Sequence, residues 1–260
     1  MLWYNKSYDN FVDDLVMILF SDFDWTLSFI EDEAKTQANI EAVKEWRERG
    51  HQFCITTGRS YVSVTRKNPQ LVGLCDYYIV DGGSILLSES GSIVEVFQFT
   101  PKIVLDITEF SKHLPEIPIP FYYTPDSEGV PLKTENITKF RLFFKNVDLL
   151  DGVAELLEKN FPVSAFTCEA TSSHKELAGQ NGFVEIIPRE LGKSHAIDVL
   201  RRRESIPLED IVTVGDGPND YEMVRDYNGY AIKGSKLNSL HRQLKTTDSV
   251  KSLVEQLLGA

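Results

Sequence analysis

Short apolar segments that each run directly into a polar loop are the feature that most constrains the fold of this chain. Three segments have this form: Val16 to Asp22, Gln52 to Thr57 and Ile211 to Gly215. They have the length of buried strands and are far shorter than the roughly 20 residues that a membrane-spanning helix needs. Between the first two, Ala34 to Arg49 has the apolar spacing of an amphipathic helix, and Gly50 follows at the position of a helix C-cap. This order predicts a βαβ unit in a parallel sheet with a right-handed crossover.

The same alternation of helices and strands continues in the first and last parts of the chain. A helix from about Tyr61 to Asn68 leads to the apolar strand Tyr77 to Val80, and a helix from Ala196 to Arg203 precedes the last of the three strands named above. We therefore predict that residues 1–83 and about 187–260 form one α/β domain with a parallel sheet.

The middle of the chain, residues 84–186, has a different pattern. Ile85 to Leu87 and Ile93 to Phe99 flank Ser90-Gly91-Ser92, which is typical of a β-hairpin. The other elements predicted in this region are a helix at Ile103 to His113, strands at Phe121 to Tyr123 and Lys139 to Phe144, a helix at Leu149 to Asn160, and strands at Val163 to Cys168 and Phe183 to Ile187. Hairpins mixed with helices predict a small α+β domain inserted into the parallel one.

The composition excludes several classes of protein. The 260 residues include 39 Asp and Glu against 27 Lys and Arg, which gives a formal net charge of −12. A nonspecific nucleic-acid binder would carry the opposite sign, so we expect no nucleic-acid partner. A hydrophobic share of 42% and a charged share of 25% are those of a globular protein that buries a core.

The cysteines and the first residues bear on location. Cys54, Cys75 and Cys168 are widely spaced and odd in number, which argues against both a disulfide framework and a zinc site. No basic region followed by an apolar stretch and a small-residue cleavage site opens the chain. We therefore expect a cytoplasmic protein without a membrane partner.

Two aspartates, Asp22 and Asp24, stand at the end of the first predicted strand. Ligands of open parallel sheets bind outside the carboxyl ends of the strands. Side chains alternate along a strand, so the two carboxylates share one side and Phe23 turns into the core. Carboxylates this close repel each other unless a cation intervenes, and oxygen ligands without a neighbouring His or Cys favour Mg²⁺ over zinc. The alternative for an isolated Asp-x-Asp pair is an Asx turn or a helix cap.

A second carboxylate-bearing loop, Gly215-Asp216-Gly217-Pro218-Asn219-Asp220, follows the strand that ends at Gly215. If the two strands share one parallel sheet, the carboxylates of both loops converge in one cleft and require cations. The alternative is a loop that starts the helix Tyr221 to Asp226 with Asp220 as its cap. That alternative accounts for Asp220 but not for Asp216.

Two further segments suit an anionic substrate. Thr57 and Gly58 follow a strand and precede a helix, whose free N–H groups attract anions, and the Thr57 hydroxyl can bind a phosphoryl oxygen. Lys193 opens another helix, where the helix dipole disfavours a cation unless an anion lies nearby. The alternatives are a helix cap for Thr57 and a solvated surface charge for Lys193.

The four segments occur in a fixed order: Asp22-Phe23-Asp24-Trp25-Thr26, Thr57-Gly58-Arg59, Gly192-Lys193, and the loop from Gly215 to Asp220. In this order they resemble the four motifs of the haloacid dehalogenase superfamily of phosphohydrolases. The long insertion between the second and third motifs resembles the type C2 cap of the Cof-type sugar phosphatases and their relatives. The resemblance implies a Rossmann-like α/β core of residues 1–83 and 187–260, with an α+β cap of residues 84–186.

The resemblance also implies the roles of the carboxylates. Asp22 would be the nucleophile that forms an aspartyl-phosphate, and Asp24 would be the general acid and base. Asp22, the Asp24 carbonyl and Asp216 would hold Mg²⁺. Asn219 and Asp220 would complete the metal shell and position the lysine of the third motif.

Thr57, Gly58 and Lys193 would bind the phosphoryl group. The chain departs from the family pattern at Trp25, where glycine is usual, and at Asp81, which replaces the usual asparagine of Asn-Gly. Both departures concern the preferred substrate more than the type of reaction.

We therefore expect Mg²⁺-dependent hydrolysis of a small phosphorylated substrate, with sugar phosphates as the class. Two alternatives stay open: transfer of the phosphoryl group to another hydroxyl, as in a mutase, and a weakly catalytic phosphosugar-binding regulatory protein. Phe121 to Tyr123 and Cys168 to Lys175 are candidates for the cap side of the cleft, with core packing and solvated loops as the alternatives.

Overall fold

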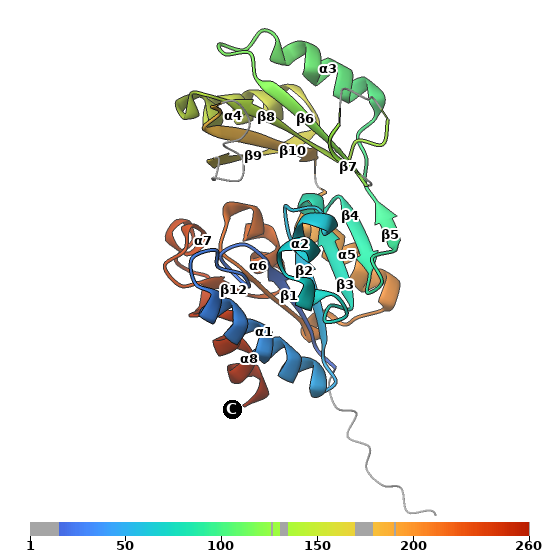
Figure 1. The fold of residues 1–260 in the computed structure, drawn as a ribbon, viewed down its shortest axis with the longest axis vertical. Helices are drawn as coiled ribbons and strands as arrows, with labels where there is room; N and C mark the ends of the chain where they lie inside the picture. Colours follow the sequence, from blue (N-terminus) through green and yellow to red (C-terminus); the bar gives the residue numbers. More distant parts are fainter. Residues whose placement is uncertain (1–15, 126, 131–134, 170–178, 190, 260) are drawn as a thin grey trace, which may run out of the picture.

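Two β-sheets organise the residues that the structure, a computed structural model, describes: 16–125, 127–130, 135–169, 179–189 and 191–259. The strands of the larger sheet are β1 (Ile18–Asp22), β2 (Gln52–Thr56), β3 (Tyr77–Val80), β4 (Ile85–Ser88), β5 (Ile93–Val96), β11 (Ile211–Gly215), β12 (Asn228–Ile232) and β13 (Lys245–Thr247). They are ordered β13-β12-β11-β1-β2-β3-β4-β5, and every pairing from β13 to β3 is parallel. The smaller sheet lies above the larger one in Figure 1.

Helices cover both faces of the larger sheet because its strands bury alternate residues on opposite sides. Leu19 packs in a cluster with α1 (Glu33–Glu48), α2 (Tyr61–Lys67) and α8 (Val250–Leu258). Its neighbours Ile18 and Phe20 pack with α5 (Lys193–Glu204), α6 (Tyr221–Asp226) and α7 (Lys236–Leu240). Each such side chain stabilises the fold by about 1.5–3 kcal/mol when fully buried. The predicted α/β class with a mostly parallel sheet is confirmed.

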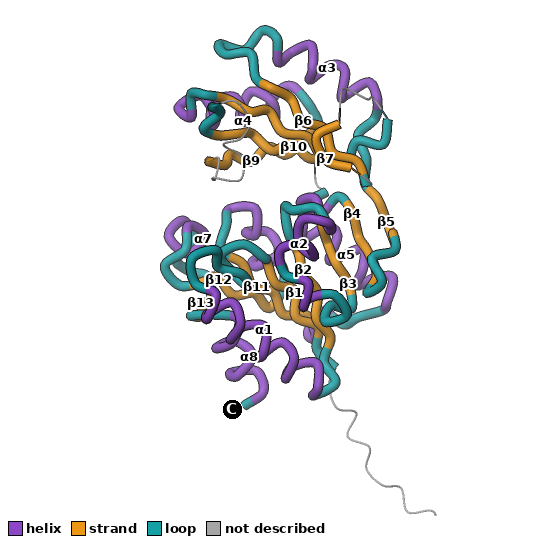
Figure 2. The backbone as a smooth tube through the Cα atoms, in the orientation of Figure 1, coloured by secondary structure: helices purple, strands orange, loops and turns teal. Residues whose placement is uncertain are grey.

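The smaller sheet is antiparallel, with the order β7-β6-β8-β10-β9. Its strands are β6 (Ile119–Thr124), β7 (Ser127–Val130), β8 (Lys139–Phe144), β9 (Val163–Glu169) and β10 (Gly182–Pro188). Its helices are α3 (Pro101–Ser111) and α4 (Leu150–Asn160). Figure 2 shows α3 on the side of this sheet that faces away from the larger one.

The two faces of the smaller sheet differ in chemistry. On β8, Phe140, Leu142 and Phe144 pack in one cluster with α3 and α4. The alternating residues Lys139 and Arg141 line a cleft between the sheets instead. The face toward the larger domain is therefore charged and aromatic, whereas the covered face is aliphatic and aromatic.

The predicted boundary of the insertion needs one correction. Sequence pattern assigns the hairpin near residues 85–99 to the inserted domain of residues 84–186, but β4 pairs with β3 and β5 with β4, so the hairpin extends the larger sheet. The insertion therefore begins after β5, and β10 carries it to Pro188. A hairpin signal specifies local pairing between two strands and not which sheet edge accepts them.

Membrane insertion has no support in the described part of the chain, where every helix is too short or too polar to serve as a transmembrane span.

Candidate active site

The carboxyl ends of β1, β2 and β11 meet at one edge of the larger sheet. β1 lies between the other two, with Asp22 opposite Thr56 and Ser21 opposite Val214. A cleft of about 770 Å³ opens at this edge, below the smaller sheet. Six of the eight predicted site residues line it: Asp22, Asp24, Thr57, Gly58, Asp216 and Asn219. The remaining two, Lys193 and Asp220, are buried: Lys193 donates to Asp22, and Asp220 accepts from Lys193.

A buried lysine joins two of the carboxylates. The Nζ of Lys193 lies 2.5 Å from Oδ1 of Asp22 and 2.6 Å from Oδ1 of Asp220. Burial opposes a charge on Lys193, but the two carboxylates outweigh it and raise the pKa of the ammonium above its usual value. Lys193 is 2% exposed, so its alternative interpretation as a solvated surface charge is wrong.

Asp220 anchors the loop after β11. Its Oδ2 accepts hydrogen bonds from the backbone N–H groups of Asp216 (3.0 Å) and Gly217 (2.9 Å). Asp220 occupies the N-cap position of α6, as the alternative predicts, but its side chain makes no capping hydrogen bond to that helix. Its carboxylate instead binds Lys193 and the loop backbone. A Cβ at Gly215 would lie 2.5 Å from the Cβ of Asp220, so only glycine lets the loop fold this tightly.

The donor set of the site fits Mg²⁺. Asp22, Asp216 and Asp220 each offer a carboxylate oxygen, and these atoms lie within 4.8 Å of one another. Burial raises the pKa of Asp22 well above its usual value; the Lys193 ammonium opposes this, while Asp220 and Asp216 add to it. Burial and the nearby Asp220 also raise the pKa of Asp216 to about 6. A hard divalent cation would relieve this repulsion.

Asp24 does not join this carboxylate cluster through its side chain. Its two oxygens accept a bidentate hydrogen bond from Arg59, at 2.5 Å from Nε and 2.9 Å from Nη2. Arg59 also donates to Ser63 Oγ at 3.2 Å. Arg59 is the cation of the second motif, and no role for it was predicted from the sequence. A planar guanidinium holds the orientation of the Asp24 carboxylate in the cleft.

The second motif folds back on the end of β3. The Thr57 N–H donates to the Ile79 carbonyl at 2.8 Å, and the Thr57 carbonyl accepts from the Gly82 N–H at 2.9 Å. The Thr57 hydroxyl accepts a hydrogen bond from the Arg59 N–H at 3.1 Å, which directs its own proton elsewhere. The cap of α2 is Ser60, so the helix-cap alternative for Thr57 is wrong.

A buried ion pair ties the smaller sheet to this motif. The Nζ of Lys139, whose side chain is fully buried, lies 2.9 Å from Oδ1 of Asp81 and 2.5 Å from the Gly58 carbonyl. Asp81 is itself 1% exposed and has a φ of 51°. A lysine of the insertion therefore contacts both Asp81, which replaces the usual asparagine, and the backbone of the second motif.

A second charged pair continues this network along the face of the smaller sheet. Arg141 Nη2 lies 2.6 Å from Oε2 of Glu185, and Arg141 Nη1 donates to the Tyr123 hydroxyl at 3.1 Å. Burial alone would raise the pKa of Glu185, but Lys139 and Arg141 outweigh burial and lower it. This pairing was invisible in the sequence, where the partners stand 44 residues apart.

The segments named as cap candidates are partly on the cleft. Phe121, Tyr123 and Cys168 line it, whereas residues 170–175 lie outside the described residues. Tyr122 faces the other way and packs in the core of the smaller domain.

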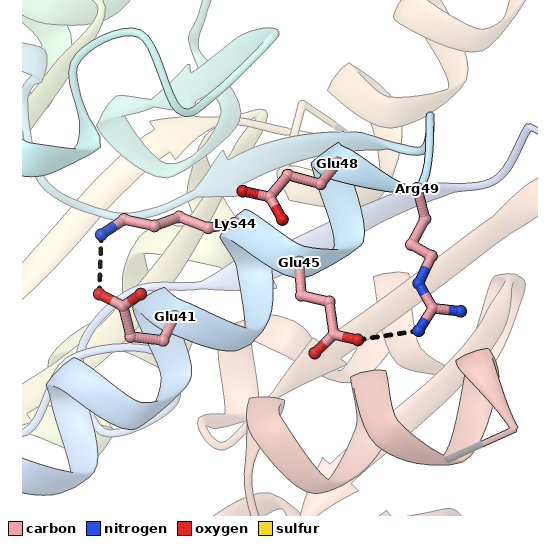
Figure 3. A pocket seen from close by; sticks show the side chains of 5 residues that line it. All are labelled: Glu41, Lys44, Glu45, Glu48 and Arg49. Carbon is pink, nitrogen blue, oxygen red and sulfur yellow. Dashed lines mark hydrogen bonds and ion pairs between the residues drawn. The ribbon is translucent and has the colours of Figure 1, made fainter.

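A second hollow lies on the outer surface of α1 (Figure 3). Its lining residues come from this single helix, and they include the exposed ion pairs Lys44–Glu41 and Arg49–Glu45. Exposed pairs of this kind contribute little and hold no ligand in place.

Comparisons with known proteins place this geometry in a family. The sequence matches the haloacid dehalogenase-like hydrolases over residues 19–130 and 121–252. A protein of Mycoplasma capricolum subsp. capricolum is 24% identical over 239 residues, which span 83% of this chain and 90% of the relative.

Solved structures share the fold over nearly the whole chain. The phosphatase BT1666 of Bacteroides thetaiotaomicron superposes with a TM-score of 0.75 at 15% identity, over 94% of this chain and 95% of the other. The subclass IIB sugar phosphatase BT4131 superposes with a TM-score of 0.71 at 17% identity, over 94% of this chain and 99% of the other.

Proposed function

This chain belongs to the haloacid dehalogenase-like hydrolases, and on that premise we propose that it hydrolyses small phosphate monoesters, with sugar phosphates as the substrate class. The proposal includes Mg²⁺ as cofactor, an aspartyl-phosphate on Asp22, and a type C2 cap formed by the smaller domain. Its substrate class draws support from the fold shared with a sugar phosphatase.

The observation that carries the proposal is the pairing of Asp22 with a buried cation. Lys193 keeps one oxygen of the Asp22 carboxylate fixed at 2.5 Å while Asp22 also lines the cleft. A charged lysine next to the nucleophile lowers the electrostatic cost of bringing a phosphate dianion to a carboxylate. A binding protein would not need this arrangement.

The proposed reaction uses both aspartates, and Asp24 exchanges its pair with Arg59 for a proton before it acts as the acid. An Asp22 oxygen attacks phosphorus, the bond from phosphorus to the alcohol oxygen breaks, and Asp24 gives its proton to the leaving alkoxide. Asp24 then takes a proton from water, whose oxygen attacks the acyl phosphate, releases inorganic phosphate and regenerates the Asp22 carboxylate. Thr57 and Lys193 donate hydrogen bonds to the transferring group.

Asp22, Asp216 and the Asp24 carbonyl are the groups that would hold Mg²⁺, with Asn219 on the same loop. The bound ion would offset the charge of the carboxylates and orient the phosphoryl oxygens. Asp220 would act by holding Lys193 and the loop, because both of its oxygens already accept hydrogen bonds.

A cytoplasmic location is also part of the proposal. Its support is that the three cysteines are free, with Cys54 and Cys75 buried.

The test is release of phosphate from a panel of sugar phosphates with Mg²⁺. We expect Asp22→Asn to lower kcat by at least ~10³-fold, because the nucleophile is lost. Asp106→Asn, on the surface of α3 far from the motifs in sequence, is the matched control and should retain wild-type rates. EDTA should abolish turnover, and added Mg²⁺ should restore it.

Undiminished turnover by Asp22→Asn would refute the assignment of Asp22 as the nucleophile. Appearance of a phosphorylated acceptor instead of free phosphate, when a second sugar is supplied, would identify a phosphotransferase. Binding of sugar phosphates without any turnover would favour a regulatory protein.

A further inference from the structure

Trp25 adopts a backbone conformation that a tryptophan rarely tolerates. Its φ is 61°, in the left-handed region, and its N–H donates to the Ser28 carbonyl at 2.8 Å within a tight turn. A bulky residue held in this region destabilises the folded state, and such outliers concentrate at functional sites. The side chain gains little from burial in return, because Trp25 is 46% exposed.

Trp25 shares the cleft with the aspartate that acts as acid and base in the proposed reaction. Trp25 follows Asp24 directly, and both residues line the cleft. The Phe29 ring meets the Trp25 ring edge-on at 6.3 Å, which supports the indole on one side. In the proposed reaction the alcohol oxygen of the substrate reaches the Asp24 carboxylate, so the carbons attached to that oxygen lie beside Trp25.

Several other lining residues of the cleft are apolar. Ile30, which is 56% exposed, lines the cleft from the larger domain, as Trp25 does, and Phe121 and Phe143 line it from the smaller sheet. Flat apolar surfaces select flat apolar partners, whereas an open-chain polyol would have to lose conformational freedom and hydration to lie against them.

We propose that Trp25 is a specificity-determining residue whose indole stacks on the apolar face of a ring in the leaving group. The protein accordingly prefers phosphate monoesters of cyclic alcohols over those of open-chain polyols. This inference rests on the proposed phosphatase function and names the class of substrate within it.

The test compares kcat/KM for two hexose-derived esters that differ in ring closure, glucose 6-phosphate and sorbitol 6-phosphate. The ratio of the two values measures selectivity for the ring. We expect Trp25→Gly to lower this ratio about 10-fold, mainly through KM for the cyclic ester, because a stacking contact of typical strength is lost.

Two further variants separate the ring from the backbone. Asn accepts a positive φ and has no aromatic ring, so Trp25→Asn should lower the ratio as Trp25→Gly does, without added glycine flexibility. Trp25→Tyr keeps an aromatic ring and should retain most of the wild-type selectivity ratio. Thermal unfolding should show a higher Tm for both the Gly and Asn variants, because the backbone strain is relieved, whereas a tryptophan with a merely structural role would show a lower one.

A selectivity ratio that stays within two-fold of wild type in both the Gly and Asn variants would overturn the inference while leaving phosphatase activity intact. If the wild-type protein releases phosphate from neither ester and from no member of the wider panel, the proposed function is overturned instead.

Discussion

At the scale of single residues, the site is a buried cluster with more negative than positive charge. The cluster contains three carboxylates, those of Asp22, Asp216 and Asp220, and one ammonium, that of Lys193. The ammonium contacts Asp22 and Asp220. Carboxylates that share a desolvated space hold protons more tightly than exposed ones, which is why the pKa values of Asp22 and Asp216 are raised. The cluster therefore costs stability in the metal-free protein.

The raised pKa of Asp216 predicts a definite pH dependence. The folded state holds this proton up to about pH 6, against a usual pKa of 3.8, so its stabilising contribution is complete at low pH and is lost as pH rises through 6. In EDTA, the Tm of Asp216→Asn relative to wild type should therefore increase between pH 5 and pH 7.5, as followed by circular dichroism. A difference that does not change with pH would contradict this assignment.

At the scale of elements, strand alternation decides which side chains reach the cleft. Successive residues of β8 point in opposite directions, so Phe140 joins the helices while Lys139 reaches Asp81 and Gly58 of the larger domain. The pair is fully desolvated, so each charge depends on the other. One strand of the insertion thus contacts the loop of the second motif directly.

Removing one member of this pair should be costly. Lys139→Met leaves Asp81 buried without its cation, which should lower the free energy of unfolding by about 3–5 kcal/mol. Urea unfolding followed by fluorescence measures this value. Lys44→Met is the matched control, since Lys44 pairs with Glu41 on the surface and should contribute at most about 1 kcal/mol.

The double variant Lys139→Met with Asp81→Asn separates loss of the pair from loss of packing. It should recover a substantial part of the stability, because no unpaired carboxylate remains. A Lys139→Met variant as stable as the Lys44→Met control would show that the pair has no structural role.

At the scale of the whole molecule, the segments before and after the insertion form one core. α1 and α8 pack in one cluster, and the Lys251 N–H donates to Asn39 Oδ1 at 3.0 Å. The strands β1 and β11, which carry the two aspartate loops, pair directly, and the Thr26 hydroxyl donates to Asp216, which lies 190 positions further along the chain. The last described helix, α8, therefore packs in the same core as the strands that carry the site.

Truncating a buried side chain of α8 should leave a cavity in the core and destabilise the folded protein. Leu253 is fully buried against the larger sheet, so Leu253→Ala should lower the free energy of unfolding by about 2–5 kcal/mol. Leu240→Ala is the control, because Leu240 is 58% exposed and its truncation should change stability by no more than about 0.5 kcal/mol. Equal unfolding midpoints for the two variants in urea would be evidence against a role for α8 in the core.

Sequence patterns were sufficient to predict the α/β class and most of the predicted site residues that line the cleft. Apolar segments that end at Asp22, Thr57 and Gly215 specify strands, and parallel strands bring their carboxyl ends to one edge of a sheet. The predicted strand Ile211 to Gly215 matches β11 residue for residue, because its apolar run is bounded by loops on both sides. Local patterns were sufficient here because backbone pairing follows from them.

The contacts of the charged side chains follow from the three-dimensional fold and not from local sequence. The contacts of Asp24 with Arg59, of Lys139 with Gly58, and of Asp220 with Lys193 join residues 35, 81 and 27 positions apart. The placement of the hairpin β4–β5 on the larger sheet is of the same kind, since either sheet edge satisfies its hydrogen bonds. Such contacts depend on the reach of long side chains and on competition between distant partners, and no local pattern along the chain encodes either.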